Sequence, residues 1–341
     1  MRALYKEWDL RKAAFANKNL VSIYFGGGTP TKLKPSEIAS LLEKISSSAS
    51  LAPDCEITLE ANPEDVTLEA MRAYAKAGIN RVSLGVQSLV DSELQLLKRQ
   101  HSAKGALDAV YACHAAGLTN LSIDLMFELP FQTLSSWRQT LQALAPLPIR
   151  HLSLYTLTFE PQTPFFKKRK SLEAALPPPE ERLQLLQEAI FHLESLGLKR
   201  YEVSAFAHPG YESRHNSGYW LARPFLGLGP SAFSYWDQKR FSNHSHFQRY
   251  LDALEQNSLP IAFEEELPYP RNIQELLAIQ LRLLRGVHLP TFEQQHAPLP
   301  SQTQTTLQQL ASRGSLRCTA NTWQLTEEGL LFYDSVASEL I

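Results

Sequence analysis

The first 204 positions alternate between short apolar stretches and longer segments with helical periodicity. The apolar stretches are rich in β-branched and aromatic residues and end in glycine or polar residues, a pattern typical of strands. Between the first two of them, Ile38, Leu41, Leu42 and Ile45 are spaced i, i+3, i+4 and i+7, so they form one apolar helix face. The pattern predicts six strands, at residues 21–25, 56–60, 81–85, 121–125, 151–157 and 200–204.

Helical segments separate these strands, and this order predicts an α/β fold with a parallel sheet. A crossover of about a dozen residues or more brings the chain back to the same edge, so consecutive strands run in the same direction. An open doubly wound sheet and a barrel both fit this pattern. No GxGxxG before a helix and no GxxxxGK[ST] occurs, so dinucleotide-binding and P-loop sites have no support.

The alternation stops at about residue 243, and the rest of the chain predicts a second, smaller domain. Apolar residues at helical spacing fill 274–284, residues 316–325 predict a hairpin, and a further helix begins at Glu327. Helices followed by a hairpin indicate a mainly helical, winged-helix-like domain. The expected division is into residues 1–242 and 243–341.

Composition agrees with a globular protein of about two domains. There are 33 Lys and Arg against 35 Asp and Glu, so the net charge is −2, whereas non-specific nucleic-acid binding needs a basic excess. Residues 301–341 carry two basic and four acidic side chains, which favours a lid or a partner-docking module over phosphate binding. No apolar run approaches the ~20 residues of a membrane span. Because residues 1–20 also lack a signal-peptide core, we expect a cytoplasmic protein without a nucleic-acid partner.

Glycine or polar residues lie at the carboxyl end of nearly every predicted strand. The carboxyl ends of parallel barrel strands open on one face, where the loops build a site. The clearest examples are Gly26, Gly27, Gly28, Glu60, Asn62, Gln87 and Asp124. Structural interpretations exist, since glycines form tight turns, Glu60 could belong to a capping loop and Asp124 could pair with a buried donor. As ligand contacts, glycines let backbone N–H groups approach a ligand, and a carboxylate accepts both hydroxyls of a ribose.

Five motifs, in this order, resemble those of one known family. They are FGGGTP at 25–30, LEANP at 59–63, LGVQS at 84–88, DLM at 124–126 and HNxxYW at 215–220. With them, nearly the whole chain resembles the radical S-adenosylmethionine proteins related to oxygen-independent coproporphyrinogen III oxidase. The HNxxYW element is similar to that of the haem chaperones in this family, and true oxidases generally lack it.

The resemblance implies a partial, TIM-like (β/α) barrel that binds S-adenosylmethionine (SAM) at the carboxyl ends of its strands. Gly27, Gly28 and Thr29 would contact the amino and carboxylate groups of the methionine part. Four residues would complete the pocket for the ribose, adenine and sulfonium parts, namely Glu60, Gln87, Arg99 and Asp124. Arg99 lies in a segment that matches a family LxRxH element, and its planar guanidinium suits a carboxylate.

The resemblance also implies a haem-binding region, formed by His215, Asn216, Tyr219 and Trp220. An imidazole is a common axial ligand of haem iron, and aromatic rings stack on a porphyrin. A surface or helix-capping role is the structural alternative for His215. The basic run Lys167–Lys170 lies in a segment, 161–179, that predicts a solvated loop, and its sharper interpretation is contact with haem propionates. The glycine-rich segment 226–233 is expected to pack closely beneath the site.

The [4Fe–4S] cluster of this family has no ligands in the 341 residues. The CxxxCxxC motif is absent, and Cys55, Cys113 and Cys318 fall before a strand, inside a predicted helix and in the C-terminal region. The chain begins with a helix that matches the family helix after the cluster loop, so the barrel is expected to lack its first strand and that loop, about 40 residues. Two explanations stay open: the start lies inside a longer reading frame, or the protein has lost its cluster.

The expected function is therefore that of a haem chaperone, which binds haem and SAM and passes haem to an acceptor protein of unknown identity. Membrane contact is expected only through that acceptor. One alternative is an oxygen-independent coproporphyrinogen III oxidase, if a longer form carries the cluster. Another is a cluster-free pseudoenzyme that serves as a scaffold. Reductive cleavage of SAM is not expected of the 341 residues alone.

Overall fold

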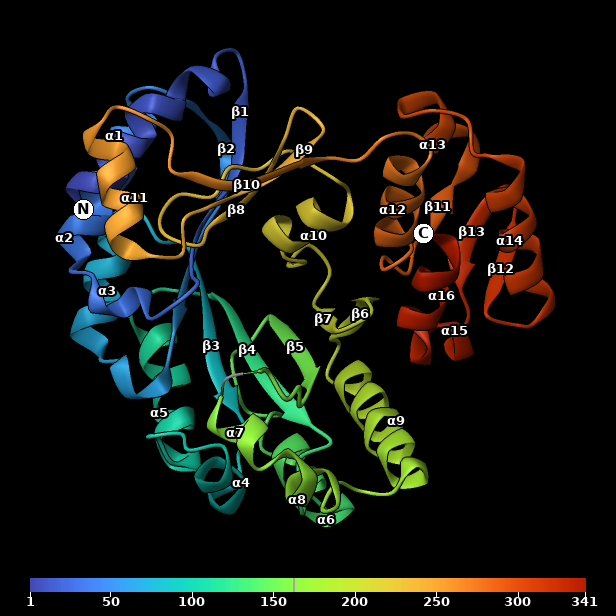
Figure 1. The fold of residues 1–341 in the computed structure, drawn as a ribbon. Helices are drawn as coiled ribbons and strands as arrows, with labels where there is room; N and C mark the ends of the chain where they lie inside the picture. Colours follow the sequence, from blue (N-terminus) through green and yellow to red (C-terminus); the bar gives the residue numbers. More distant parts are fainter. Residues whose placement is uncertain (162) are drawn as a thin grey trace.

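The computed structural model describes residues 1–161 and 163–341, and a curled seven-stranded sheet forms its largest part (Figure 1). The strands lie in the order β1-β2-β3-β4-β5-β7-β6. Their bounds are β1 Asn19–Phe25, β2 Ser50–Ala61, β3 Arg81–Gln87, β4 Asn120–Phe127, β5 His151–Thr156, β6 Lys199–Glu202 and β7 Ala205–Ala207. Strands β1 to β5 pair in parallel, which confirms the predicted α/β fold.

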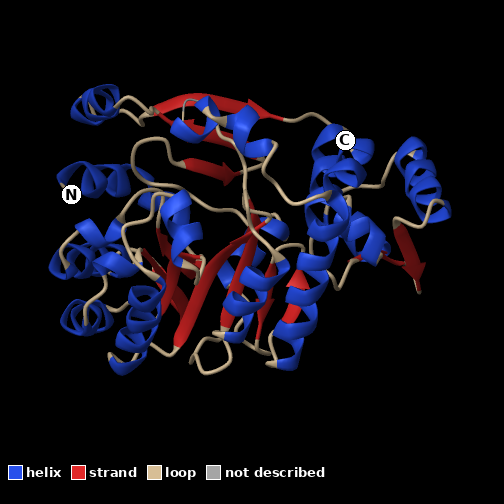
Figure 2. Ribbon diagram, turned by 90° about the horizontal axis from the view of Figure 1, so that it is seen from below, coloured by secondary structure: helices blue, strands red, loops and turns tan. Residues whose placement is uncertain are grey.

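Helices connect the parallel strands and pack on one face of the sheet (Figure 2). The apolar stripe predicted for the first connecting helix is fully buried in the main core, together with Leu84 and Ile123 of the sheet. The helices and 3₁₀ turns of this region are α1 (Arg2–Arg11), η1 (Lys12–Phe15), η2 (Pro30–Lys32), α2 (Pro35–Ser46), η3 (Pro63–Asp65), α3 (Leu68–Ala77), α4 (Asp91–Leu96), α5 (Ala103–Ala115) and α6 (Leu134–Gln142).

The other face of the sheet is polar, because successive strand residues point to opposite faces. Thr58 and His151 on this face have no exposed surface, and Arg81 is only 2% exposed. Residues in register on it include Glu60 with Ser83, Ser83 with Ser122, and Asp124 with Ser153. Buried polar side chains need internal partners, so this face must be satisfied by other parts of the chain.

The strand predicted at 200–204 is present as β6 and runs in the same direction as β5, but it is not the next strand of the sheet. A further strand that was not predicted, β7, lies between them and pairs antiparallel with both β5 and β6. The carboxylate of Glu202 accepts hydrogen bonds from the backbone N–H (3.0 Å) and the hydroxyl (3.1 Å) of Ser204 and so stabilises the turn. Strands of three or four residues are too short for a periodic pattern to show.

A second, antiparallel sheet follows, which the sequence pattern did not predict. Its strands lie in the order β10-β9-β8. A Cβ atom on Gly227 would lie 2.2 Å from the carbonyl oxygen of Phe233, so the two ends of the segment 226–233 pack closely on each other. The bounds are β8 Phe233–Trp236, β9 Lys239–Asn243 and β10 Ile261–Glu266, with helix α11 (Phe247–Glu255) between the last two.

Helix α1 is joined to this second sheet by a buried polar network around Glu7. Its carboxylate accepts hydrogen bonds from the Tyr250 hydroxyl (2.7 Å), the Asn243 amide (2.7 Å) and the backbone N–H of Gly229 (2.8 Å). It also pairs with Arg11 at 3.0 Å. Because Glu7 has no exposed surface, these donors compensate for the loss of its hydration.

The segment 161–179 was predicted to be a solvated loop. It contains two short helices, so the prediction that it is irregular is wrong. The basic side chains Lys167–Lys170 are nevertheless exposed. Residue 162 of this segment lies outside the described part of the chain. The helices are α7 (Pro164–Lys167) and α8 (Arg169–Glu173), followed by the long α9 (Pro179–Ser195).

The C-terminal unit has its own hydrophobic core, which extends from Ile273 to Leu340. Its small sheet has the order β11-β13-β12, and the predicted hairpin at 316–325 and helix at Glu327 are confirmed. The elements are α12 (Arg271–Gln280), β11 (Val287–His288), α13 (Leu289–Gln295), α14 (Ser301–Ser312), β12 (Leu316–Thr319), β13 (Thr322–Leu325), α15 (Glu327–Leu331) and α16 (Tyr333–Leu340). Across residues 1–161 and 163–341, no helix has the length and apolar character needed to cross a membrane.

Candidate functional site

The triple glycine after β1 forms an open cradle beside Glu60. The Glu60 carboxylate accepts a hydrogen bond from the Tyr24 hydroxyl (2.6 Å) and a longer one from the backbone N–H of Gly27 (3.3 Å). A Cβ on Gly26 would lie 2.6 Å from the Tyr24 ring and 2.9 Å from the Glu60 carboxyl group, so only glycine fits there. Gly27, with φ +83°, and Gly28 face open space, which leaves room for a ligand.

Gln87 and Arg99 meet at the end of β3, above Gly85. The Arg99 guanidinium donates hydrogen bonds to the Gly85 carbonyl (2.8 Å) and the Asn62 side chain (3.2 Å). A Cβ on Gly85 would lie 2.8 Å from Arg99 and 3.0 Å from the Gln87 amide, so this glycine admits both side chains. Gln87 has φ +67°, a costly conformation for a residue with a side chain and one that often marks functional sites.

Asp124 lies on the polar face between β3 and β5. Its carboxylate accepts a hydrogen bond from the Ser83 hydroxyl (3.3 Å), and Ser83 is in register with Glu60 on β2. Burial raises the pKa of Asp124 to about 6, opposed by a hydrogen bond from Ser153 and by the Arg81 charge. The structure thus brings Glu60 and Asp124 onto one face.

Thr29 lies at the start of η2, where its carbonyl accepts the N–H of Lys32 (3.0 Å).

The HNxxYW segment forms helix α10 (Arg214–Trp220), which lies against the polar face of the sheet (Figure 1). The first turn of α10 is docked on the buried carboxylate of Glu56. Backbone N–H groups of Arg214 and His215 each donate to it at 3.0 Å, and the Ser213 hydroxyl donates at 3.4 Å. A carboxylate at a helix N-terminus satisfies N–H groups that have no partner within the helix.

His215 lies half-buried between β1 and the rest of α10. One ring nitrogen contacts the Ser22 hydroxyl (3.1 Å) and the other contacts the Tyr219 hydroxyl (2.7 Å). Its ring stacks on Tyr24 with the centroids 4.6 Å apart. Burial, helped by the Arg81 and Arg223 charges, lowers the pKa of His215 to about 4, so the imidazole is neutral at physiological pH.

The two candidate regions share Tyr24, which sequence reasoning missed. One face of its ring stacks on His215, and its hydroxyl donates to Glu60 in the glycine cradle. Ser22 and Tyr24 are the polar positions of an otherwise apolar strand, and this alternation was the available signal. Glu56 was missed as well. It lies four residues before Glu60 on β2 and therefore on the same face of the strand.

The remaining members of the HNxxYW element are also placed by the protein. The backbone N–H of Asn216 donates to the Ser213 hydroxyl at 3.2 Å. Trp220 lies under the guanidinium of Arg282, which comes from the C-terminal unit and is 4.3 Å from the centre of the indole ring. Glu202, the last residue of β6, points to this same arginine rather than to the glycine cradle.

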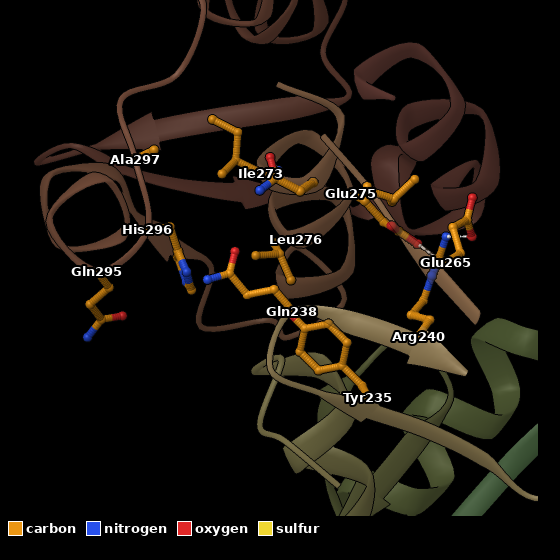
Figure 3. Close-up of a pocket in the computed structure, with 12 residues that line it drawn as sticks. Tyr235, Gln238, Arg240, Glu265, Ile273, Glu275, Leu276, Gln295, His296 and Ala297 are labelled. Carbon is orange, nitrogen blue, oxygen red and sulfur yellow. Dashed lines mark hydrogen bonds and ion pairs between the residues drawn. The ribbon is translucent and has the colours of Figure 1, made fainter. Parts of the chain in front are cut away.

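A cavity of about 190 Å³ lies elsewhere, between the second sheet and the C-terminal unit. Tyr235 of β8 and Leu276 of α12 face it from opposite sides (Figure 3). Arg240 at its edge is held by Glu265 and Glu275. The described residues that line this cavity include none of the predicted SAM or haem residues, so it is separate from the candidate site.

Two family models match the chain. One, described as the Radical SAM superfamily, matches residues 8–144, and the other, described as the HemN C-terminal domain, matches residues 271–332. A protein named heme chaperone HemW from Bacillus subtilis is 30% identical over 338 residues, which is 98% of this chain and 89% of that protein. The chain belongs to the HemW family of radical SAM proteins. HemW of Synechocystis is 36% identical over 290 residues, 84% of this chain and 68% of that protein.

The fold of this HemW family member is also similar to that of a solved enzyme. Coproporphyrinogen III oxidase (HemN) from Escherichia coli, a radical SAM enzyme, superposes with a TM-score of 0.85 at 25% sequence identity. The match covers 99% of this chain and 82% of that one. It confirms the half-barrel with a smaller C-terminal unit.

The radical SAM family implies two groups, SAM and a [4Fe–4S] cluster, and the residues present fit only one of them. The open glycine cradle, the acceptor Glu60 and the space kept by Gly85 suit SAM. A cluster needs several thiolates together. Cys55 and Cys113 are buried, Cys318 is exposed, and in the described part of the chain no three His, Cys, Asp or Glu side chains gather as metal ligands. The residues of this chain therefore do not fit the cluster.

Proposed function

We propose that this chain is a haem chaperone that binds haem at α10, binds SAM at the glycine cradle and delivers haem to an acceptor protein. The observation that carries the proposal is Tyr24, which touches both His215 of the HNxxYW helix and Glu60 of the cradle. The names of the HemW relatives support the haem part of the proposal. The acceptor is a second protein that must remove haem from α10.

The SAM part of the proposal assigns a role to each residue at the strand ends. Backbone N–H groups of Gly27 and Gly28, with Thr29, hold the methionine end. Four further side chains complete the pocket, and they are Glu60, Gln87, Arg99 and Asp124. Glu60 keeps unshared electron pairs beyond the bonds from Tyr24 and Gly27, so it can accept ribose hydroxyls.

The haem part assigns His215 as the iron ligand and Asn216, Tyr219 and Trp220 as its surroundings. A metal ligand must be a neutral imidazole, and the lowered pKa of His215 keeps it in that form at physiological pH. Both ring nitrogens contact a hydroxyl group, Ser22 at 3.1 Å and Tyr219 at 2.7 Å, so one of these contacts must be given up to bind iron. Haem binding therefore includes a rearrangement around the His215 ring.

Titration with haem tests the assignment of His215. We expect His215→Ala to weaken haem binding about tenfold or more, since loss of one strong contact is worth at least ~1.4 kcal/mol. The Soret band measures both affinity and ligation. His215→Gln keeps a hydrogen-bonding side chain and checks that any loss reflects ligation rather than unfolding.

His114, exposed on α5, provides the matched control for this titration. His114→Ala removes a surface imidazole and should leave the titration unchanged. Equal affinity and an identical spectrum in wild type, His215→Ala and His215→Gln would contradict the role of His215. A wild-type protein that gives no Soret shift would instead support a scaffold without haem.

Coproporphyrinogen III oxidation is the second candidate, and the similarity of the fold to HemN favours it. The reaction in this family depends on a cluster that the residues of this chain do not fit, so we assign no catalytic step to it. Anaerobic reconstitution with iron and sulfide, followed by incubation with coproporphyrinogen III, SAM, a one-electron reductant and an electron acceptor, decides between the two. Protoporphyrinogen formation would favour the oxidase, and haem binding without turnover would favour the chaperone.

A further inference from the structure

Arg282, in the turn after α12, reaches out of the C-terminal unit to Trp220 on α10. Its guanidinium carbon lies 4.3 Å from the centre of the indole ring and 4.9 Å from the ring of Tyr333 on α16. A guanidinium is attracted to aromatic faces, and the attraction grows when water is excluded. We call this arrangement of Trp220, Arg282 and Tyr333 the Arg282 contact. It joins the C-terminal unit to the candidate haem element.

The polar partners of the Arg282 guanidinium are held at long distance. One nitrogen lies 3.5 Å from the Glu202 carboxylate and 3.4 Å from the Ser204 hydroxyl. In the described part of the chain, Nε of Arg282, Oε2 of Glu202 and the indole Nε1 of Trp220 are buried without a hydrogen-bond partner. Buried polar atoms without partners are unfavourable, so this closed arrangement is one that a ligand can replace.

The same turn also reaches the other end of α10 through β6. The backbone N–H of Leu284 donates to the carbonyl of Tyr201 at 3.0 Å, and Leu283 forms a β-bridge with Glu202. The hydroxyl of Tyr201 in turn accepts the N–H of Ser213, the N-cap residue of α10, at 3.3 Å. A shift of the turn at 282–284 would therefore alter contacts at both ends of α10.

We propose that Arg282 regulates access to the candidate haem element. In the closed state it covers the aromatic face of Trp220, and it must leave that face before a porphyrin ring can stack there. A planar macrocycle and the guanidinium use the same surface, so each excludes the other. This inference rests on the proposed haem-binding function and adds to it a role for the C-terminal unit as the element that opens.

Acrylamide quenching of tryptophan fluorescence tests the closed contact without haem. The signal of Trp220 is obtained as the difference between each protein and the same protein with Trp220→Phe. For Arg282→Ala we expect about a fivefold rise in the open population of Trp220, the scale that loss of one cation–aromatic contact predicts. Arg282→Lys keeps the charge but not the planar group, so its open population of Trp220 should lie between those of wild type and Arg282→Ala.

Stopped-flow mixing with haem tests the consequence for binding. Arg282→Ala should bind haem about fivefold faster than wild type, in line with the larger open population. Arg285→Ala removes a neighbouring exposed arginine from the same turn and should behave as wild type. Tyr333→Leu removes the second ring of the Arg282 contact and should shift both measurements in the direction of Arg282→Ala, which guards against misfolding of one variant.

The outcomes separate this inference from the proposed function. Haem binding by wild type, with unchanged quenching and association in Arg282→Ala and Tyr333→Leu, overturns the role of Arg282 alone. A wild-type protein that binds no haem overturns both. Faster binding and greater quenching in both variants, with Arg285→Ala unchanged, supports the role.

Discussion

At the scale of single residues, burial on the polar face shifts the pKa values of two titratable groups in the direction that favours their uncharged forms. It raises the pKa of Asp124 to about 6 and lowers the pKa of His215 to about 4. Removal from water disfavours the charged form of either group. The two shifts oppose each other in their effect on stability, since one group favours the folded state at low pH and the other favours it at higher pH.

Asp124→Asn should remove one part of the pH dependence of stability. In the unfolded chain this carboxyl group titrates near 3.8, and in the folded protein near 6. Between these values the folded protein holds a proton that the unfolded chain has lost, so the free energy of unfolding falls as the pH rises, by at most about 3 kcal/mol. Because His215 contributes a rise over the same range, the test is the difference between the two proteins: in urea denaturation from pH 4 to pH 7, the free energy of unfolding of Asp124→Asn should rise more steeply with pH than that of wild type.

Asp237, exposed in the turn between β8 and β9, offers the control for this experiment. Asp237→Asn should keep the wild-type slope between pH 4 and pH 6. If Asp124→Asn also keeps that slope, the carboxyl group is not held protonated in the folded protein, and burial would not be its dominant influence.

The residues that sequence reasoning found and missed differ in where they lie. Glu60 and Gln87 were predicted because they end strands, where a parallel sheet collects its polar side chains. Tyr24 and Glu56 lie inside strands and were overlooked, since a polar residue there has several structural explanations. Arg282 acts on α10 from another unit of the chain, and no local pattern reveals such a contact.

At the scale of elements, α10 depends on its docking to the sheet. It has seven residues, fewer than the ~12–15 that a helix needs to be stable by itself in water. Two of its backbone N–H groups are held by the Glu56 carboxylate, which also lies 3.9 Å from the buried Arg81. The position of the HNxxYW residues thus follows from one carboxylate on β2.

Glu56→Gln should therefore destabilise the protein and release α10. An amide can accept on one side only, and it removes the carboxylate that is 3.9 Å from the buried Arg81. We expect the free energy of unfolding to fall by about 3 kcal/mol. Urea denaturation gives the global loss, and hydrogen exchange at the amides of Arg214 and His215 reports on the helix itself.

Glu212→Gln is the matched control, because this exposed carboxylate precedes α10 and accepts the backbone N–H of Gly210 as its one hydrogen bond among the described residues. It should change the stability by a few tenths of a kcal/mol at most. Similar stabilities and exchange rates for Glu56→Gln and wild type would mean that α10 is held by its side-chain contacts instead.

The elements themselves were predictable in proportion to their length and regularity. The parallel strands and their connecting helices follow from the apolar pattern, as does the hairpin at 316–325. The strands β7 to β10 have only three to six residues, so an alternation of apolar and polar positions is hard to see in them. The antiparallel return at β7 is set by the Glu202 turn, which a pattern of apolar positions does not record.

At the scale of the whole molecule, we propose that the boundary between the two units falls near residues 267–270. The expected boundary at 242/243 passes through β9, which pairs with both β8 and β10. Asn243 itself belongs to the buried network of Glu7. The second core begins at Ile273, so the chain after β10 is where the contacts of one unit give way to those of the other.

Tyr24 predicts that the SAM and haem sites influence each other. Tyr24→Phe keeps the ring that stacks on His215 but removes the hydroxyl that holds Glu60. We expect haem to change the affinity of wild type for SAM by about threefold. SAM must then change the affinity for haem by the same factor. We expect the variant to bind each ligand with an affinity that no longer depends on the other, as measured by calorimetric titration.

Tyr211→Phe, which removes the hydroxyl of a residue outside both sites, should retain the wild-type dependence. A dependence that persists in Tyr24→Phe would place the connection elsewhere in the molecule. If wild type already binds the two ligands independently, the contact through Tyr24 positions the two sites but does not couple their binding free energies.

The Glu7 network has a consequence for the way in which the protein is made. Helix α1 leaves the ribosome well before the partners of its buried carboxylate, which are 222, 236 and 243 positions further along the chain. Until those positions have been synthesised, Arg11 is the one partner of this network that Glu7 can pair with. The face of α1 that carries Glu7 stays exposed to solvent. Helix α1 can therefore take its final place only after the chain has been synthesised as far as Tyr250.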